Sequence, residues 1–508
     1  MSVPPVPHRE PVTLAELTRE LPPGRPVDPA DLAATVTSAR RLVVLDDDPT
    51  GTQSIADLPV LTTWSVQDLR WALQQDTAGF FVLTNSRSLT PEDAADRNRE
   101  IVHALAEAAA AEGVQYAIAS RSDSTLRGHF PLETDVLAAE LAGLGSPVDG
   151  VLVVPAYLEP GRITIDSVHW TRTADGMVPV AQSEFARDAT FGYHESDLRA
   201  WVQEKTDNRI AAEDVAAITL DDLRVGGPDR VQDLLGALTG GAPVVVDAVT
   251  DDDLRVLVQA VVAAEARGRT FLYRVGPSFV RARAGQQARP AIDAELLQAI
   301  VRDARRAAVH SPGSDDARPA APHGLIVVGS HVGLTTRQLD ALRRRGHIVE
   351  LELEVPTLLD EQAAPAHLAG IVDRAVELLA DASSADDVVI RTSRTLVTGR
   401  DAQHSLHISR TVSAASVAVV RAIAARIRPA FVVAKGGITS SDTAALGLSV
   451  LRAWSRGTLL PGIVSLWEPV AGPAQGIPYV VFAGNVGDDD ALVDVLDTLR
   501  TLSPGSPA

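Results

Sequence analysis

Short apolar segments alternate with longer amphipathic segments along most of the chain after residue 41. We predict strands at 42–45, 80–83, 116–119, 151–154, 217–220, 244–247 and 270–275, where apolar residues are concentrated. We predict helices between them at 91–111, 132–142, 229–237 and 251–266, where the spacing of apolar residues is helical. Strands that alternate with helices in this way are typical of a parallel sheet covered by helices.

A second series of the same kind follows residues 309–323, a segment rich in Pro, Gly, Ser and Asp that we predict to be a linker. We predict strands at 325–328, 348–353, 388–391, 431–434, 462–466 and 479–482, and helices near 335–345, 358–380, 411–427 and 488–500. The predicted fold is therefore two α/β domains with mainly parallel sheets, at 38–308 and 324–508. Ligand sites are expected at the carboxyl ends of the strands and in the cleft between the domains.

Residues 1–37 precede the first predicted strand, and we expect them to form a helical arm. Thr13 and Glu16 have the spacing of a capping box. Asp28 followed by Pro29 indicates a second helix start, because aspartate caps free amide groups and proline fits the first helical turn. We predict two short helices here and find no residues suited to catalysis.

The composition is that of an ordinary soluble protein, and it excludes several kinds of site. Of the 508 residues, 45% are hydrophobic, 22% are charged and none is cysteine. The lack of cysteine excludes disulfides, thiolate nucleophiles and cysteine-ligated metals. The formal net charge of −20 opposes binding to nucleic acid or to an anionic membrane. With no run of 18 apolar residues and no apolar signal core at the N-terminus, a cytoplasmic location is expected.

Three adjacent carboxylates, Asp46, Asp47 and Asp48, follow the first predicted strand. Their charges repel one another, so each needs a partner such as an arginine, a magnesium ion or a ligand hydroxyl. The following Pro-Thr-Gly also suits a solvated turn, and this alternative stays open. The position after an apolar strand favours a ligand site.

Hydroxyl groups and arginines follow two further predicted strands of the first domain. Segment 84–88 contains Arg87 between two serines, and segment 120–129 contains Asp123 and Arg127 among several hydroxyls. Arginine binds carboxylates and phosphates through two parallel hydrogen bonds, while hydroxyls and an aspartate suit a polyhydroxylated ligand. Together with the acidic segment, these loops predict a pocket for a small hydroxy acid.

Glycines and hydroxyls follow three predicted strands of the second domain, in segments 329–333, 434–442 and 483–487. Glycines at strand-to-helix turns let backbone amides approach an anion, and the start of a helix favours negative charge. The hydroxyls of Ser330 and Thr439 can add hydrogen bonds. Each loop alone could be an ordinary tight turn, but three in one domain predict a nucleotide phosphate site.

Asp46, Asp48 and Thr50 also fit the start of a haloacid-dehalogenase-like phosphatase, in which the first aspartate is the nucleophile and the second the general acid. Such an enzyme also needs a lysine further along the chain. Lys205 is the only lysine of the first domain and does not follow a predicted strand. This alternative leaves the glycine-rich second domain unexplained. No P-loop, dinucleotide fingerprint or nucleophile elbow is present.

The order of these motifs resembles the four-carbon acid sugar kinases, which include D-threonate, D-erythronate and 3-oxo-tetronate kinases. The resemblance covers residues 42–500 and rests on the segments at 47–51, 85–88, 122–128, 329–331, 435–442 and 484–487. In that family the N-terminal domain binds the sugar acid and the C-terminal domain binds ATP. The resemblance implies substrate contacts from Asp47, Arg87, Ser122, Asp123, Ser124 and Thr125. It implies ATP contacts from Ser330, Gly436, Gly437, Ile438, Thr439 and Gly484.

The expected reaction is MgATP-dependent phosphorylation of a terminal hydroxyl of a four-carbon sugar acid. Arg87, or Arg127 as a second candidate, would pair with the substrate carboxylate, and Asp48 would line the same pocket. Asp47 or Asp123 would accept the hydroxyl proton as general base.

On the nucleotide side, Lys435 would neutralise phosphate charge and Asp442 would hold Mg²⁺. The alternatives are a surface lysine at the strand end and an aspartate that only caps a helix. Closure of the two domains would exclude water from the reacting groups. The alternative without catalysis is a sugar-acid-binding regulatory protein. The expected partners are a sugar acid and ATP, with no nucleic acid or membrane, and a homodimer is compatible with the sequence.

Overall fold

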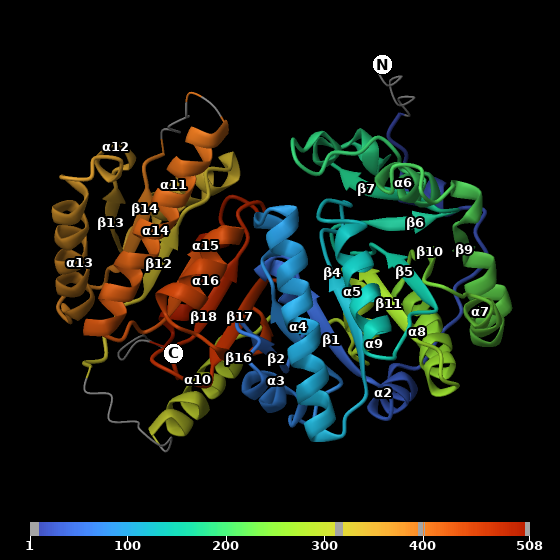
Figure 1. Cartoon of the computed structure of the whole chain (residues 1–508). Helices are drawn as coiled ribbons and strands as arrows, with labels where there is room; N and C mark the ends of the chain where they lie inside the picture. The colour runs from blue at the N-terminus through green and yellow to red at the C-terminus, as the bar shows by residue number, and fades with distance from the viewer. Residues whose placement is uncertain (1–9, 310–317, 395–399, 401, 503–508) are drawn as a thin grey trace. The chain divides into compact units, whose positions relative to one another are not determined.

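A computed structural model of the chain describes residues 10–309, 318–394, 400 and 402–502 (Figure 1). Unit 1 comprises Met1–Leu58 and Trp64–Ala288, and unit 2 comprises Pro59–Thr63 and Arg289–Ala508. Residues 1–9 of the predicted arm and residues 310–317 of the predicted linker lie outside the described residues. The predicted class of two α/β domains with mainly parallel sheets is confirmed.

The sheet of unit 1 has the strand order β3-β1-β4-β11-β5-β10-β9, and every neighbouring pair is parallel. Its strands are β1 (Arg41–Asp46), β3 (Gly79–Leu83), β4 (Tyr116–Arg121), β5 (Gly150–Val154), β9 (Ala216–Ile218), β10 (Ala242–Val246) and β11 (Phe271–Val275). Nearly all of their residues are buried, because helices cover the sheet. Since the strands are parallel, the loops that follow them meet at one edge.

The helices of unit 1 are α1 (Leu14–Leu17), α2 (Pro29–Thr37), α3 (Val66–Leu73), α4 (Pro91–Glu112), α5 (Leu132–Gly143), α6 (Leu198–Lys205), α7 (Gly227–Gly236), α8 (Asp251–Ala266) and α9 (Pro277–Arg283). Six of them, namely α1, α2, α3, α4, α6 and α8, begin after a residue whose side chain caps the first turn. The predicted capping box of Thr13 and Glu16 and the predicted cap at Asp28 are both present. Thr250 and Asp253 form a further capping box that starts α8.

A small antiparallel sheet, not predicted from the sequence, follows β5. It consists of β6 (Ile163–Ile165), β7 (Val168–Thr173) and β8 (Gly176–Pro179). Figure 1 shows β7 beside α6, and a bridge between Val168 and Asp197 joins the two regions. The buried side chain of Trp201 on α6 stacks on Phe130, with ring centroids 4.5 Å apart, in the same hydrophobic cluster as Val180. The small sheet is therefore fixed to the body of unit 1.

The sheet of unit 2 has the order β13-β14-β12-β15-β18-β17-β16-β2. Its strands are β2 (Leu58–Leu61), β12 (Leu325–Val328), β13 (Ile348–Leu353), β14 (Asp387–Thr392), β15 (Val432–Lys435), β16 (Arg452–Thr458), β17 (Val464–Pro469) and β18 (Tyr479–Phe482). The first five strands in this order are parallel, whereas β16 and β17 form an antiparallel hairpin. The segment Pro59–Thr63, from early in the sequence, lies at the end of this order beside β16.

The helices of unit 2 differ from the sequence prediction in two places. They are α10 (Ala294–Val309), α11 (Gly333–Arg345), α12 (Val355–Leu358), α13 (Ala364–Ala380), α14 (Ala402–Arg426), α15 (Gly437–Asp442) and α16 (Ala491–Arg500). One difference is α14, which begins at Ala402 rather than near residue 411. The single helix predicted at 358–380 is also wrong at its start, because α12 ends at Leu358 and a new helix begins at Ala364. Pro365 lies in the first turn of α13, where its missing amide hydrogen costs nothing, whereas inside a longer helix it would break the hydrogen-bond ladder.

Among the described residues, one segment, Ile408–Arg426 of α14, is long and apolar enough to cross a membrane. Length and composition alone are weak evidence, because core helices pass the same test. Val420 and Ile423 on this segment are fully buried in unit 2, as expected of a core helix.

Candidate functional sites in the two units

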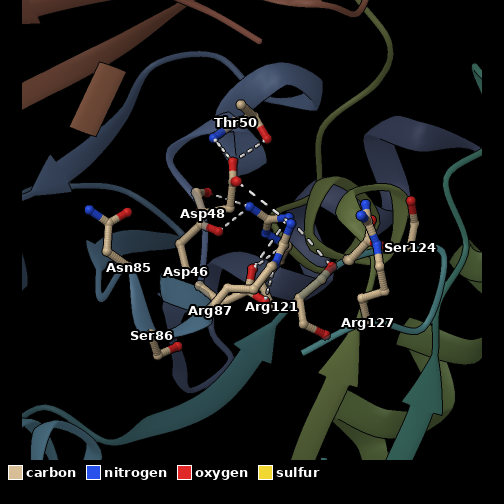
Figure 2. Close-up of polar contacts among 12 residues, drawn as sticks. Asp46, Asp48, Thr50, Asn85, Ser86, Arg87, Arg121, Ser124 and Arg127 are labelled. Carbon is tan, nitrogen blue, oxygen red and sulfur yellow. Dashed lines mark hydrogen bonds and ion pairs between the residues drawn. The ribbon is translucent and has the colours of Figure 1, made fainter. Parts of the chain in front are cut away.

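The acidic segment after β1 forms the start of a short 3-10 helix, Pro49–Ser54. Asp48 caps this helix by accepting hydrogen bonds from the amide (2.9 Å) and the hydroxyl (2.5 Å) of Thr50. Burial alone would raise the pKa of Asp48, but Arg87 and Arg121 outweigh burial and lower it. Figure 2 shows these groups close together at the carboxyl ends of β1, β3 and β4. The segment is thus a structured part of a charge network.

Asp47 and Arg87 form the central ion pair of this network. The Arg87 guanidinium donates from Nη2 to Asp47 Oδ1 (2.6 Å) and from Nε to Asp47 Oδ2 (3.0 Å), and Nη1 lies 3.6 Å from Asp48 Oδ2. Arg87 follows Asn85, whose positive φ of 51° turns the chain after β3. Two of the three guanidinium nitrogens are therefore committed to Asp47 in this structure.

Asp46 is more deeply buried than Arg87 and pairs with Arg121, the last residue of β4. Burial raises the pKa of Asp46 to about 7 despite the opposing effect of Arg121. A Cβ added at Gly51 would lie 2.2 Å from Asp46 Oδ2 and 2.3 Å from Arg121 Nη2, so the backbone at Gly51 closes over the pair. Asp46 is only 1% exposed. It has no room to attack a phosphate ester, which argues against the phosphatase alternative.

The loop after β4 brings the predicted residues Ser122 to Arg127 to the same edge. Asp123 accepts hydrogen bonds from the Thr125 hydroxyl and from Arg127 Nε, the latter at 2.6 Å. Burial alone would raise the pKa of Asp123, but Arg87, Arg127 and Arg162 outweigh burial and lower it well below its usual range. Ser122, Ser124 and Thr125 are buried, and Asp123 and Arg127 are partly exposed.

Four residues hold this loop in place. From the sequence, Arg162 could reach the pocket or belong to a plain loop, whereas His169, Tyr193 and Arg274 were not singled out. The Arg162 Nη1 donates to Ser124 Oγ (2.7 Å), and His169 Nε2 lies 2.9 Å from the Ser124 carbonyl oxygen. Tyr193 donates its hydroxyl to the Thr125 carbonyl (2.7 Å), and Arg274 donates to the Arg127 carbonyl (3.2 Å). Burial lowers the pKa of His169 to about 4, so the imidazole is neutral at physiological pH. The small sheet and β11 thus shape the candidate pocket.

In unit 2 the three glycine-rich loops converge, as predicted. A Cβ added at Gly329 would lie 2.2 Å from the Thr439 hydroxyl oxygen, and one added at Gly484 would lie 2.4 Å from the Ser330 hydroxyl oxygen. Thr335, near the start of α11, donates to the Gly484 carbonyl (2.9 Å) and lies 3.1 Å from Ser330 Oγ. The loops after β12, β15 and β18 therefore surround a cluster of hydroxyl groups.

Arg394, which the sequence analysis did not single out, adds a positive charge to this cluster. It donates to the Ser330 carbonyl and, from Nη2, to Thr336 Oγ1 (2.6 Å). Its position after a strand and among hydroxyls matches the pattern used to find the loops of the first domain. The same pattern could therefore have identified Arg394 from the sequence.

Lys435 and Ile438, two predicted nucleotide contacts in and after β15, differ from each other in burial. The Lys435 side chain is fully buried, donates from Nζ to the Ala483 carbonyl (3.0 Å) and lies 3.7 Å from the centroid of the Phe482 ring. Burial lowers the pKa of Lys435 to about 7. The side chain of Ile438 is 55% exposed. Any effect of Lys435 on a bound phosphate therefore acts through the loop at Ala483 rather than by direct contact.

Asp442 is a poor metal ligand in this structure. Its carboxylate accepts a hydrogen bond from the Ser413 hydroxyl (2.5 Å), and burial raises its pKa, which disfavours the charged form that a metal needs. Within the described part of the chain, no group of three or more potential His, Asp or Glu ligands is found. The predicted Mg²⁺ contact of Asp442 stays a prediction.

We expect Gly484→Ala to weaken ATP binding about 10-fold or more, because the added methyl group collides with the Ser330 hydroxyl and displaces the loops. Calorimetric titration with ATP measures the loss. Gly370→Ala in α13 is the matched control, since an added Cβ there meets no atom within 4 Å. Unchanged ATP affinity in Gly484→Ala would remove this loop from the predicted nucleotide site.

Comparison with protein families assigns a binding role to each half of the chain. A family described as the sugar-binding N-terminal domain matches residues 42–283, and one described as the nucleotide-binding C-terminal domain matches residues 325–492. The carboxylate, hydroxyl and arginine loops lie in the first match, and the glycine loops lie in the second. No curated protein matches the sequence.

Solved structures with the same fold are known. The Haemophilus influenzae protein HI1011, a member of a domain family of unknown function, is 18% identical with a TM-score of 0.58, and the alignment covers 90% of this chain and 100% of that one. A Salmonella typhimurium LT2 protein with a provisional name as a tRNA synthase is 15% identical with a TM-score of 0.61, covering 90% and 98%. At these identities, the likeness establishes the fold.

Proposed function

Because this chain belongs to the four-carbon acid sugar kinase family, we propose that it transfers the terminal phosphoryl group of ATP to a hydroxyl of a four-carbon sugar acid. The observation that carries the proposal is the division of chemistry between the units. Carboxylates, hydroxyls and arginines gather at the strand ends of unit 1, and glycine loops around hydroxyls gather at those of unit 2. Phosphoryl transfer needs both a positioned alcohol and a held nucleotide.

On the acceptor side, Asp47 is the better candidate for the general base. A base must accept a proton, and the pKa of Asp123 is held well below its usual range because nearby arginines outweigh the effect of burial. Asp47 pairs with Arg87. A Cβ added at Gly128 would lie 3.1 Å from Asp47 Oδ2 and 3.7 Å from Ser122 Cβ, so Asp47 lies beside the loop after β4. We expect a sugar hydroxyl to be held there. Asp48, Arg87 and Arg127 complete the proposed pocket.

On the nucleotide side, we assign the phosphate contacts to Ser330, the segment 436–439 and Gly484. The support is the packing of these loops around shared hydroxyls and the match of residues 325–492 to a nucleotide-binding domain. Arg394 supplies a cation beside them. When MgATP is bound, the metal would neutralise phosphate charge, and the residues named here hold and orient the nucleotide.

The first test is release of ADP from MgATP in the presence of purified protein and a panel of acids. The panel holds D- and L-threonate, D- and L-erythronate and their 3-oxo forms. ADP release that depends on one acid establishes the kinase and names its substrate. ATP binding without ADP release across the panel excludes these acids as substrates, and a protein that binds no ATP is not a kinase.

A further inference from the structure

Arginines gather at the carboxyl ends of the strands in unit 1, and three of those that lie in or directly after β3 and β4 pair with carboxylates. The pairs are Arg87 with Asp47, Arg121 with Asp46, and Arg127 with Asp123. Among the residues that the structure describes, Arg162 and Arg274 have no carboxylate oxygen within the 4.0 Å limit of an ion pair. Arg162 lies near enough to Asp123 to help lower the pKa of that carboxyl, but the two groups do not form an ion pair, so the guanidinium keeps donors that a ligand carboxylate can occupy.

Arg274 is more deeply buried than Arg162 and already donates to the loop after β4. It lies within β11, it is only 3% exposed, and its Nη1 is buried without a hydrogen-bond partner. Its Nη2 donates a hydrogen bond to the Arg127 carbonyl. Arg274 therefore supports the loop from below, and Arg162 is the remaining candidate for contact with an anion.

Arg162 is held in a fixed orientation with its guanidinium partly exposed. Its backbone pairs with that of Tyr157 through two hydrogen bonds of 2.9 and 3.0 Å. The guanidinium carbon lies 5.5 Å from the centroid of the Phe185 ring and 5.9 Å from that of Tyr157. Nη1 donates to Ser124 Oγ, so the planar guanidinium contacts the loop that we expect to bind the sugar acid. An arginine held in this way loses little conformational freedom when it binds a ligand.

We propose that Arg162 binds the substrate carboxylate and thereby makes the site select sugar acids over neutral polyols. The inference rests on the proposed function and reassigns the anchor expected at Arg87. Arg87 already uses two nitrogens on Asp47, whereas Arg162 has only a serine hydroxyl as a polar side-chain partner in the described structure. The planar fork of arginine matches a carboxylate, and a neutral polyol gains nothing from it.

Calorimetric titration with D-threonate and D-erythronate, without ATP, tests the assignment separately from turnover. Loss of a charged hydrogen-bond pair predicts affinity about 10- to 100-fold weaker in Arg162→Gln than in the unaltered protein. Arg162→Lys keeps the charge without the fork and should recover only part of the affinity. Arg209→Gln is the matched control, because Arg209 is a surface arginine of unit 1 whose side chain is 54% exposed and pairs with Asp135. Thermal unfolding of each variant verifies that the fold is intact.

Threitol and erythritol, which lack the carboxylate, complete the design. The unaltered protein should prefer the acid to the polyol of the same stereochemistry, and Arg162→Gln should lose that preference. Equal acid affinity in a folded Arg162→Gln variant overturns the proposal, as does failure of the unaltered protein to bind either acid. If acid binding depends on Arg162 but no ADP is released, the proposed kinase activity is overturned. The assignment of Arg162 as the residue that binds the carboxylate is then retained.

Discussion

Replacing Asp47 by Asn is expected to lower kcat by about 10²- to 10⁴-fold, the usual contribution of a general base. Asparagine has nearly the shape of aspartate, but its amide does not accept the substrate proton. ATP affinity should be unchanged, because the predicted nucleotide contacts lie in unit 2. Steady-state kinetics of ADP release and calorimetric titration with ATP measure the two quantities.

The Asp47→Asn result also separates two roles for this carboxylate. Asp47 orients Arg87 through two hydrogen bonds, and loss of that role alone would raise KM for the acid with kcat nearly kept. Loss of the base lowers kcat. Asp96→Asn on the exposed face of α4 is the control and should change neither quantity, since its side chain is 70% exposed. An unchanged kcat in Asp47→Asn would remove Asp47 from the reaction.

Gly51→Ala is expected to destabilise unit 1 by about 3 kcal/mol or more, the cost of disrupting a buried ion pair. The added methyl group would lie between the Asp46 carboxylate and the Arg121 guanidinium, neither of which has space to move. For a unit of this size, Tm should fall by about 6 °C or more. Scanning calorimetry measures the shift.

Gly143→Ala, in the same unit, is the matched control for Gly51→Ala. An added Cβ at Gly143 meets no atom within 4 Å, and neither glycine has a positive φ, so the two changes differ only in what surrounds them. The control should unfold at or slightly above the temperature of the unaltered protein. If both variants behave alike, the Asp46–Arg121 pair is not the tightly closed element described above.

The elements that the sequence predicted well have strong local signals. The helix predicted at 251–266 coincides with α8, which begins at a capping box and keeps a regular apolar face. The hairpin of β6 and β7 was not predicted, because its turn at Asp166 and Ser167 uses two positive φ angles without the glycine or asparagine that usually marks such a turn. Tertiary contacts therefore set this turn rather than local preference.

Some residues of the candidate site could likewise be predicted from the sequence, and others could not. Asp47, Arg87 and the segment 122–127 follow strands, and parallel pairing brings them together without further information. Arg274 lies inside an otherwise apolar strand, opposite Ser120 and Val153, and an all-buried strand has no polar face to reveal where its side chain points. Arg162 follows a Pro-Gly turn whose sequence is equally typical of a plain loop. Its role depends on aromatic rings and a serine distant in sequence.

Strand β2 has a consequence for how the protein can be divided. The segment Pro59–Thr63 comes from the N-terminal part of the sequence but belongs to unit 2. There the Thr62 amide donates to the Leu451 carbonyl (3.2 Å). A fragment containing only residues 289–508 would leave the edge of β16 without this neighbour. Unpaired sheet edges recruit other chains, so such a fragment is prone to aggregation. The sheet of the nucleotide-binding half thus includes residues encoded more than 200 positions upstream of the rest of unit 2.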